Sequence, residues 1–294
     1  MNAKKIDRIW TSVLYIISFL VVALLVLLIG IILYRGVGFW EPQFLFGKPK
    51  LGEAGGGIGI QLFNSFYILI LTLVISIPLG IGAGIYLSQY AKEGKFLNII
   101  RLSIETMASL PSIVVGLFGL LIFVNATGWG FTIIGGALAI TILNLPSLTR
   151  VSENAIRDVA SKYSEASLGM GATKWQTIVK VLLPAAFPQI LTGIILAAGR
   201  IFGEAAALLY TAGMSAPSLN FAASITSKAN PFNIFRPAET LSVYIWKLNS
   251  EANLPDAAAI ANKSAAVLII MVLLFNVISR ILSNKIYEKY RGAK

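Results

Sequence analysis

Six long apolar stretches dominate this chain of 294 residues. A helix rises about 1.5 Å per residue, so crossing roughly 30 Å of lipid hydrocarbon takes about 20 apolar residues. The composition agrees, because 56% of the residues are hydrophobic and only 13% are charged, which is low for a soluble protein. We therefore predict an all-α, polytopic membrane protein with about six transmembrane helices, at roughly 11–34, 63–90, 99–125, 131–150, 185–210 and 262–284.

The first apolar stretch follows Lys4, Lys5 and Arg8, a beginning that also suits a secretory signal peptide. However, the run Ile9–Leu33 is longer than the apolar part of a usual signal peptide, and no small-residue cleavage site follows it. We therefore expect an uncleaved first span. The predicted organisation is an N-terminal helix with its outer loop (1–62), a transmembrane domain (63–284) with an inner loop (151–184), and a tail (285–294).

Basic residues concentrate on one side of the predicted membrane. With both termini inside, the inner segments hold 16 of the 24 Lys and Arg residues and the outer segments hold 7, while Arg200 lies within a span. Cytoplasmic loops of membrane proteins carry such an excess. The bias predicts a multi-pass protein of the cell membrane with both termini in the cytoplasm, and it accounts for the net charge of +11 without nucleic acid as a partner.

Missing residue types exclude much chemistry. Without Cys or His, the chain has no disulfide, thiolate nucleophile, imidazole base or ordinary zinc site. It also lacks a G-x-x-x-x-G-K-[ST] phosphate-binding loop, since the glycine-rich run Gly55–Gly59 has no following Lys. We expect no enzyme activity, cofactor or metal, and any ATP that drives this protein must be bound by another polypeptide.

The inner loop at 151–184 is the most informative connection. It is predicted to form two short helices across the cytoplasmic face, with a sharp turn at Gly169 and Gly171 and with Pro184 in the first turn of the next span. The side chains of Leu168 and Trp175 would form an exposed apolar surface for a partner protein to contact. The alternative is an amphipathic loop that packs on the membrane surface.

Residues 165–184 resemble the cytoplasmic signature of ATP-binding-cassette (ABC) importer permeases. That signature is Glu-Ala-Ala, three residues, Gly, nine residues, Ile, any residue and Leu-Pro; here Ser167 replaces the third Ala and Val181 replaces Ile. The resemblance implies a type I ABC importer permease fold whose loop docks into a groove on an ATPase subunit. The coupling residues that it implies are Glu165, Ala166, Gly169, Gly171, Ala172 and Trp175.

Other stretches are similar to the phosphate-specific permeases of this class. They are Leu110–Gly119, Arg200–Ala205 and Leu208–Gly213, while Leu241–Trp246 is similar to the A-type (PstA-like) permease of the pair. Ala205 stands where the family usually has Thr. The resemblance implies import of inorganic phosphate and four kinds of partner: a second, C-type permease, two ATPase subunits, an extracytoplasmic phosphate-binding protein and membrane lipid.

Arg200 and Glu204 form the only acid–base pair deep in a predicted span. A charge at the bilayer centre costs about 2.5–3.5 kcal/mol on insertion scales, so such residues normally face a bundle interior or a water-filled cavity. The i, i+4 spacing predicts both side chains on one helix face, and a guanidinium fits phosphate oxygens. The pair either lines the substrate pathway or fixes helix packing without touching substrate.

Alternative functions remain open at this point. The permease could carry another oxyanion, such as phosphonate, molybdate or sulfate. A stand-alone channel has no use for an ATPase-docking loop, and a secondary transporter usually has more intramembrane carboxylates than Glu204 alone.

Overall fold

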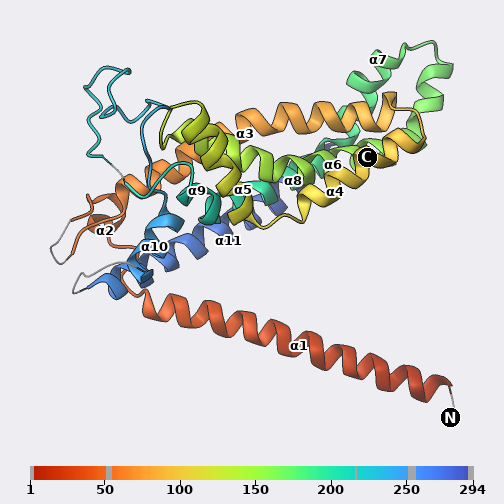
Figure 1. The fold of residues 1–294 in the computed structure, drawn as a ribbon. Coiled ribbons are helices and arrows are strands. Elements are labelled where there is room, and N and C mark those ends of the chain that lie inside the picture. Colours follow the sequence, from red (N-terminus) through yellow and green to blue (C-terminus); the bar gives the residue numbers. More distant parts are fainter. Residues whose placement is uncertain (1–2, 51–54, 216, 251–255, 291–294) are drawn as a thin grey trace.

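A computed structural model describes residues 3–50, 55–215, 217–250 and 256–290. Within these ranges the chain is mostly helical, and its only β structure is an isolated bridge between Pro49 and Gly56. The all-α prediction is therefore confirmed. Figure 1 shows an elongated bundle, with α7 at one end and α2 and α10 at the other. Residues 291–294 of the predicted tail lie outside the described residues.

The helices vary widely in length. Those with α-helical geometry are α1 (Ala3–Arg35), α2 (Pro42–Phe46), α3 (Gly59–Ile85), α4 (Lys95–Ala108), α5 (Ser112–Gly119), α6 (Ile133–Gly169), α7 (Lys174–Thr177), α8 (Leu183–Gly203), α9 (Ala206–Leu209), α10 (Leu241–Ser250) and α11 (Ala257–Tyr290). Three π-helical segments continue or precede them, namely η1 (Tyr86–Tyr90), η2 (Leu120–Ala126) and η3 (Ile178–Leu182).

Five helical stretches among the described residues are long and apolar enough to cross a membrane, and a bent pair brings the number to six. The bent pair is α4 with α5 and η2, whose axes differ by 97°. The stretch predicted as one span at 99–125 is therefore a bent pair of helices rather than one continuous helix. Pro111 explains the break, because proline lacks an amide hydrogen and disfavours helical geometry at the preceding residue; its own backbone is extended (φ −60°, ψ 136°).

α6 is longer than the sequence predicted. The fourth span was expected to end near residue 150, with separate short helices after it, but α6 continues without a break to Gly169 despite Pro146. Residues 151–168 contain no Gly or Pro that would interrupt a helix. In addition, Ala155 and Ile156 are buried against the start of α8, which stabilises the extension. The first of the two predicted inner helices is therefore an extension of the fourth span. The second, α7, continues through η3 into α8 without a break, so that Lys174–Gly203 is one helical stretch.

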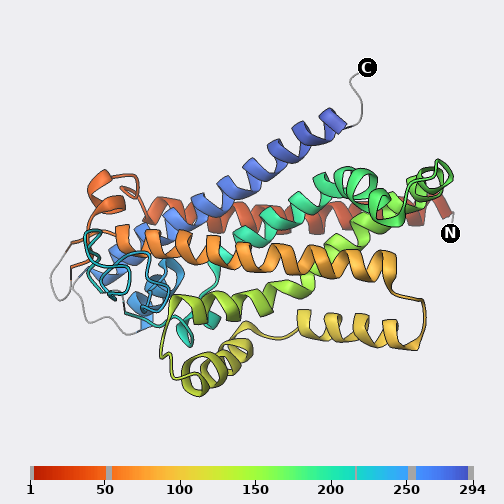
Figure 2. The same ribbon diagram turned by 90° about the horizontal axis from the view of Figure 1, so that it is seen from above.

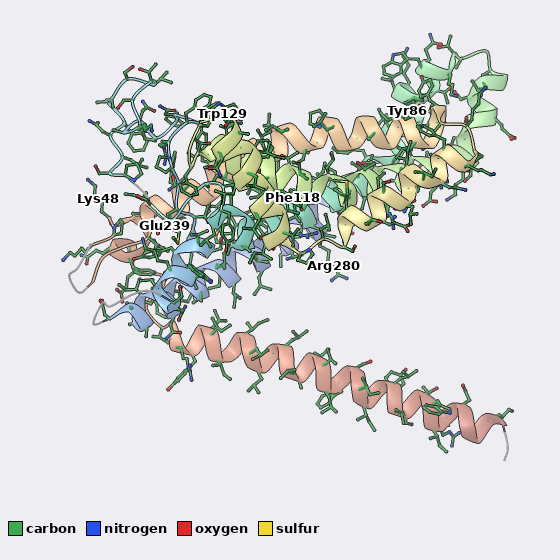
Figure 3. All side chains as sticks on the ribbon, in the orientation of Figure 1. Lys48, Tyr86, Phe118, Trp129, Glu239 and Arg280 are labelled. Carbon is green, nitrogen blue, oxygen red and sulfur yellow. The ribbon has the colours of Figure 1, made fainter. Side chains whose placement is uncertain are left out.

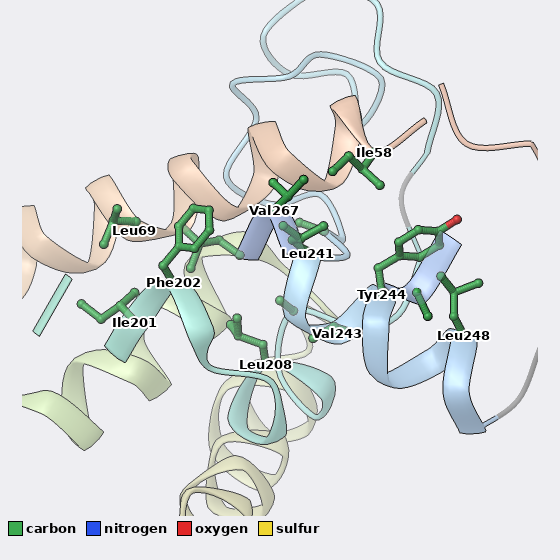
Figure 4. Packing of buried hydrophobic residues seen from close by; sticks show 14 of the residues in the cluster. Ile58, Leu69, Ile201, Phe202, Leu208, Leu241, Val243, Tyr244, Leu248 and Val267 are labelled. Carbon is green, nitrogen blue, oxygen red and sulfur yellow. The ribbon is translucent and has the colours of Figure 1, made fainter. Parts of the chain in front are cut away.

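Two apolar clusters hold the bundle together. The larger lies toward the α10 end and packs Phe202 and Leu208 against Leu241 and Val243 (Figure 4). The smaller lies toward α7 and joins Ala155 and Ile156 of α6 to η3 and α8. Each end of the bundle thus has its own core.

α1 stands apart from this bundle. Figure 1 shows it diverging from the other helices, and its apolar residues are exposed within this chain. Contact with α11 is close at Gly36, where an added Cβ would lie 2.5 Å from the Cβ of Ala266. Both ends of the chain lie toward the end of the molecule that holds α7 (Figure 1).

α3 and α6 approach closely along a line of small residues. A Cβ at Gly80 would lie 2.8 Å from Leu148, and one at Gly84 would lie 2.5 Å from the Cβ of Ser152. Small residues let helix backbones come together, which is the usual means of tight packing in membranes.

We predict that Gly84→Ala destabilises the folded protein by about 1–3 kcal/mol, because the added methyl group overpacks this contact. Gly82→Ala is the matched control, since nothing lies within 4 Å of a Cβ at Gly82 on the same helix. Thermal unfolding of the purified protein in detergent measures both. Equal melting temperatures for the two variants would contradict the close α3–α6 contact.

Candidate functional site: the coupling loop and two polar clusters

A sharp turn follows the end of α6. Gly171 has φ of +85°, a conformation that L-residues with side chains rarely adopt, and nothing would contact a Cβ there. The chain then enters α7 through a capping box, in which the Thr173 side chain accepts from the amide of Gln176 and the Gln176 side chain accepts from the amide of Thr173. The predicted turn is thus present, and Gly171 is the residue that requires glycine.

The loop is anchored on one side and open on the other. Thr177 is buried and its hydroxyl lies 2.9 Å from that of Ser167, while Ile178 packs in the smaller core. On the opposite side, Trp175 is 61% exposed and Met170 is 89% exposed. An anchored turn with exposed apolar side chains is suited to docking a partner protein.

The other residues implied as coupling residues share this surface. Glu165, Ala166 and Gly169 are exposed near the end of α6, and Ala172 is half-buried beside Gly171. Their contact with an ATPase stays a prediction, because the structure contains this chain alone.

Arg200 and Glu204 are not arranged as predicted. α8 ends at Gly203, and Glu204 has extended backbone geometry (φ −71°, ψ 126°), so the two residues do not share a helix face. Oε1 of Glu204 instead accepts a 3.3 Å hydrogen bond from the amide of Ala207 at the start of α9. Arg200 is exposed in the last turn of α8, and no ion pair joins it to Glu204 in the described part of the chain.

A buried arginine that the sequence analysis did not single out lies in the connection between α9 and α10. Arg236 is fully buried; Nη2 donates to Oδ1 of Asn64 on α3 at 2.7 Å, and Nε donates to the carbonyl oxygen of Pro231 at 3.1 Å. Burial lowers the pKa of the Arg236 guanidinium to about 10. Arg236 fastens this irregular connection to α3. The polar Asn64 in an apolar span was the available signal.

Glu239 forms a second buried centre beside it. Its carboxylate accepts from Nε2 of Gln61 at 2.9 Å and from Nζ of Lys247 at 3.0 Å. Burial raises the pKa of this carboxyl, and both hydrogen-bonding partners oppose the rise. Figure 3 shows Glu239 toward the opposite end of the molecule from Tyr86, which belongs to η1. The two centres tie α3, α10 and the irregular connection together.

Known proteins share both the sequence and the fold. Residues 76–292 match the family described as binding-protein-dependent transport system inner membrane component. The chain belongs to this family. It is therefore the permease subunit of an ABC importer, a multi-pass protein of the plasma membrane.

Relatives of this permease cover most of its length. It is 52% identical over 290 residues to the probable ABC transporter permease protein YqgI of Bacillus subtilis, covering 98% of this chain and 99% of that protein. It is 36% identical over 235 residues to the phosphate transport system permease protein PstA of Xylella fastidiosa, covering 79% and 77%.

A solved structure supports the fold of the permease. The bacterial alginate ABC transporter, in complex with its alginate-bound periplasmic protein, superposes with a TM-score of 0.65 at 16% identity, covering 97% of this chain and 98% of that one. At this identity the likeness concerns the fold alone, and it confirms the predicted ABC importer permease architecture.

We predict that Gly171→Ala destabilises the turn between α6 and α7 by about 1–2 kcal/mol, because the new residue must adopt a left-handed backbone conformation. Gly169→Ala is the control, since Gly169 lies in the last turn of α6 and nothing would contact its Cβ. Protease nicking of the loop and thermal unfolding measure the difference. A Gly169 variant as susceptible as the Gly171 variant would refute the special role of this turn.

Proposed function

We propose that this permease translocates inorganic phosphate across the cytoplasmic membrane as one subunit of an ATP-driven importer. The observation that carries the proposal is the similarity to proteins named phosphate transport system permease protein PstA, which extends over about four fifths of the chain. The similarity to YqgI is higher, but that name states no substrate.

The proposed assembly contains a second, C-type permease, two ATPase subunits and an extracytoplasmic phosphate-binding protein. ATP hydrolysis belongs to the ATPase subunits, for which the exposed surface around Trp175 is the proposed docking site. In the proposed orientation, α7 and both ends of the chain face the cytoplasm. α2, α10 and the connection that Arg236 anchors then face the phosphate-binding protein.

Arg200 is the proposed anion contact within the membrane. Its guanidinium is exposed in this chain and has no ion-pair partner among the described residues, so a passing phosphate meets a cation that is not already neutralised. The planar fork of N–H donors suits phosphate oxygens. Glu204 lies just beyond the end of α8, where its hydrogen bond to α9 holds it beside the pathway rather than against Arg200.

The open side of α8 suits an interface with the second permease. Gly203 is exposed, and nothing in this chain lies within 4 Å of a Cβ placed there. A partner helix can approach such a surface closely. In the proposed cycle, ATP binding closes the ATPase dimer and displaces the coupling loop, the helices rock to open the pathway outward, and hydrolysis resets them.

We predict that Arg200→Gln lowers phosphate uptake at least about tenfold in the assembled transporter, since about 1.4 kcal/mol of lost anion stabilisation corresponds to a factor of ten. Arg200→Lys should keep part of the uptake. Arg35→Gln is the matched control, because Arg35 is also exposed in the last turn of a spanning helix. Unchanged phosphate uptake in Arg200→Gln, with normal assembly, would remove Arg200 from the pathway.

Substrate identity is tested in proteoliposomes that contain the complete transporter and its receptor. Uptake of labelled phosphate should require ATP, and a large excess of unlabelled phosphate should suppress it, while sulfate, molybdate and phosphonate should not. Labelled sulfate or molybdate carried in preference to phosphate would overturn the assignment. ATP-independent flux would indicate a channel, and sensitivity to a proton uncoupler at constant ATP would indicate secondary transport.

A further inference from the structure

α4 is a separate arm on the side of the bundle. The 97° bend after Ala108 separates it from α5, and its main packing partner is α6. The outer face of α4 presents Phe96, Ile99 and Leu102, which are all exposed. In Figure 2 it runs beside the bundle, connected to α3 by a loop at one end and to α5 at the other. Its position therefore depends on what holds it to α6.

Apolar packing beneath α4 is incomplete. A cavity of about 300 Å³ lies between this helix, the α3–η1 junction and α6. α4 contributes Ile100, Ile104 and Met107 to the lining, and Pro146 lies among the α6 residues across from them. The middle of α4 therefore does not close tightly on its neighbours, and other contacts must set its register.

Those contacts are ion pairs of alternating sign. Glu153 of α6 is only 5% exposed and accepts from Nε of Arg101 on α4 at 3.0 Å, and Arg157 pairs with the same carboxylate. One turn away the signs are reversed, since Nη2 of Arg150 on α6 lies 2.5 Å from Oε1 of Glu105 on α4. These five side chains, together with Ile104 and Asn154, line a cavity of about 210 Å³. We refer to the five charged residues as the α4–α6 clasp.

The order of charges in the clasp permits one register. Along α6 the signs run plus, minus, plus at Arg150, Glu153 and Arg157, and along the antiparallel α4 they run minus and plus at Glu105 and Arg101. Moving α4 by one turn in either direction would bring Arg101 opposite another arginine, and like charges that face each other are unfavourable. The clasp thus specifies where α4 lies along α6.

The clasp is also connected to the coupling loop through a continuous helix. Glu153 precedes Gly169 by 16 residues of unbroken α6, or about 24 Å at the helical rise. On its other side, Ser152 lies against Gly84 of α3. A displacement of the coupling loop would therefore be transmitted to Glu153 through one continuous helix, whereas the 97° bend after Ala108 interrupts the helix between α4 and α5.

We propose that the α4–α6 clasp makes α4 move with α6 during the transport cycle, so that Arg101, Glu105, Arg150 and Glu153 are positioning residues for energy coupling. α4 then swings about residues 109–111 when the coupling loop is displaced. The proposal rests on coupling to an ATPase, as proposed above, but it does not depend on the identity of the substrate.

Charge exchange across the exposed pair tests the clasp. In the assembled transporter, Arg150→Glu alone and Glu105→Arg alone should each lower phosphate uptake at least about tenfold, because each variant places like charges opposite one another. The double variant restores an opposite-charge pair and should recover uptake to within about threefold of the wild type. Glu93→Gln is the control, since Glu93 is 77% exposed and 3.5 Å from Arg101. Single variants with normal uptake, or a double variant no better than the singles, would overturn the proposal.

A distance measurement keeps the test independent of both folding defects and substrate. The natural chain has no Cys, so spin labels can be placed uniquely on exposed positions such as Phe96 of α4 and Lys162 of α6. In the complete transporter, the distance between the two labels should stay constant when a non-hydrolysable ATP analogue is added. In Arg150→Glu the distribution of this distance should become broader. A large change in the wild type would show that α4 moves separately. If the distance between the labels stays constant but the transporter does not carry phosphate, the substrate assignment is contradicted and the proposal for the clasp is unaffected.

Discussion

The close contact between α3 and α6 is the interaction on which the rest of the permease depends. In a bilayer, helices gain little from hiding apolar surface, so van der Waals contact between small residues must hold them. Gly80 and Gly84 permit that contact, with Leu148 and Ser152 filling the space. The clasp and the smaller core are built on the same length of α6, so the α7 end of the bundle is organised around this seam.

Hydropathy predicted the helical class and most of the spans, because apolar length is a property of the sequence alone. It failed at Pro111, where one residue converts an apparent continuous span into a bent pair. It also ended α6 too early, because the extension beyond residue 150 is amphipathic and is stabilised by packing of Ala155 and Ile156 against η3 and α8. The local backbone chemistry of proline decided the first boundary, and tertiary contact decided the second.

The candidate site was predictable where a local conformation demands a residue type. Gly171 is such a position, and the turn is where the spacing placed it. Arg200 and Glu204 were expected to share a helix face, but the end of α8 at Gly203 separates them. The buried centres at Arg236 and Glu239 escaped prediction, because their partners Asn64 and Gln61 lie more than 170 residues away in sequence.

The unbroken passage of α6 from its spanning part to the turn at Gly171, the proposed ATPase-docking region, has a consequence for permissible chain length. Each residue in a helix turns the following part by about 100°. Inserting or deleting a single residue between Glu153 and Gly171 would rotate the exposed face around Trp175 by that angle while the spanning part stayed fixed. The number of residues in this segment therefore sets the direction in which the face around Trp175 points. Permeases that engage the same ATPase are expected to preserve this length as well as the composition.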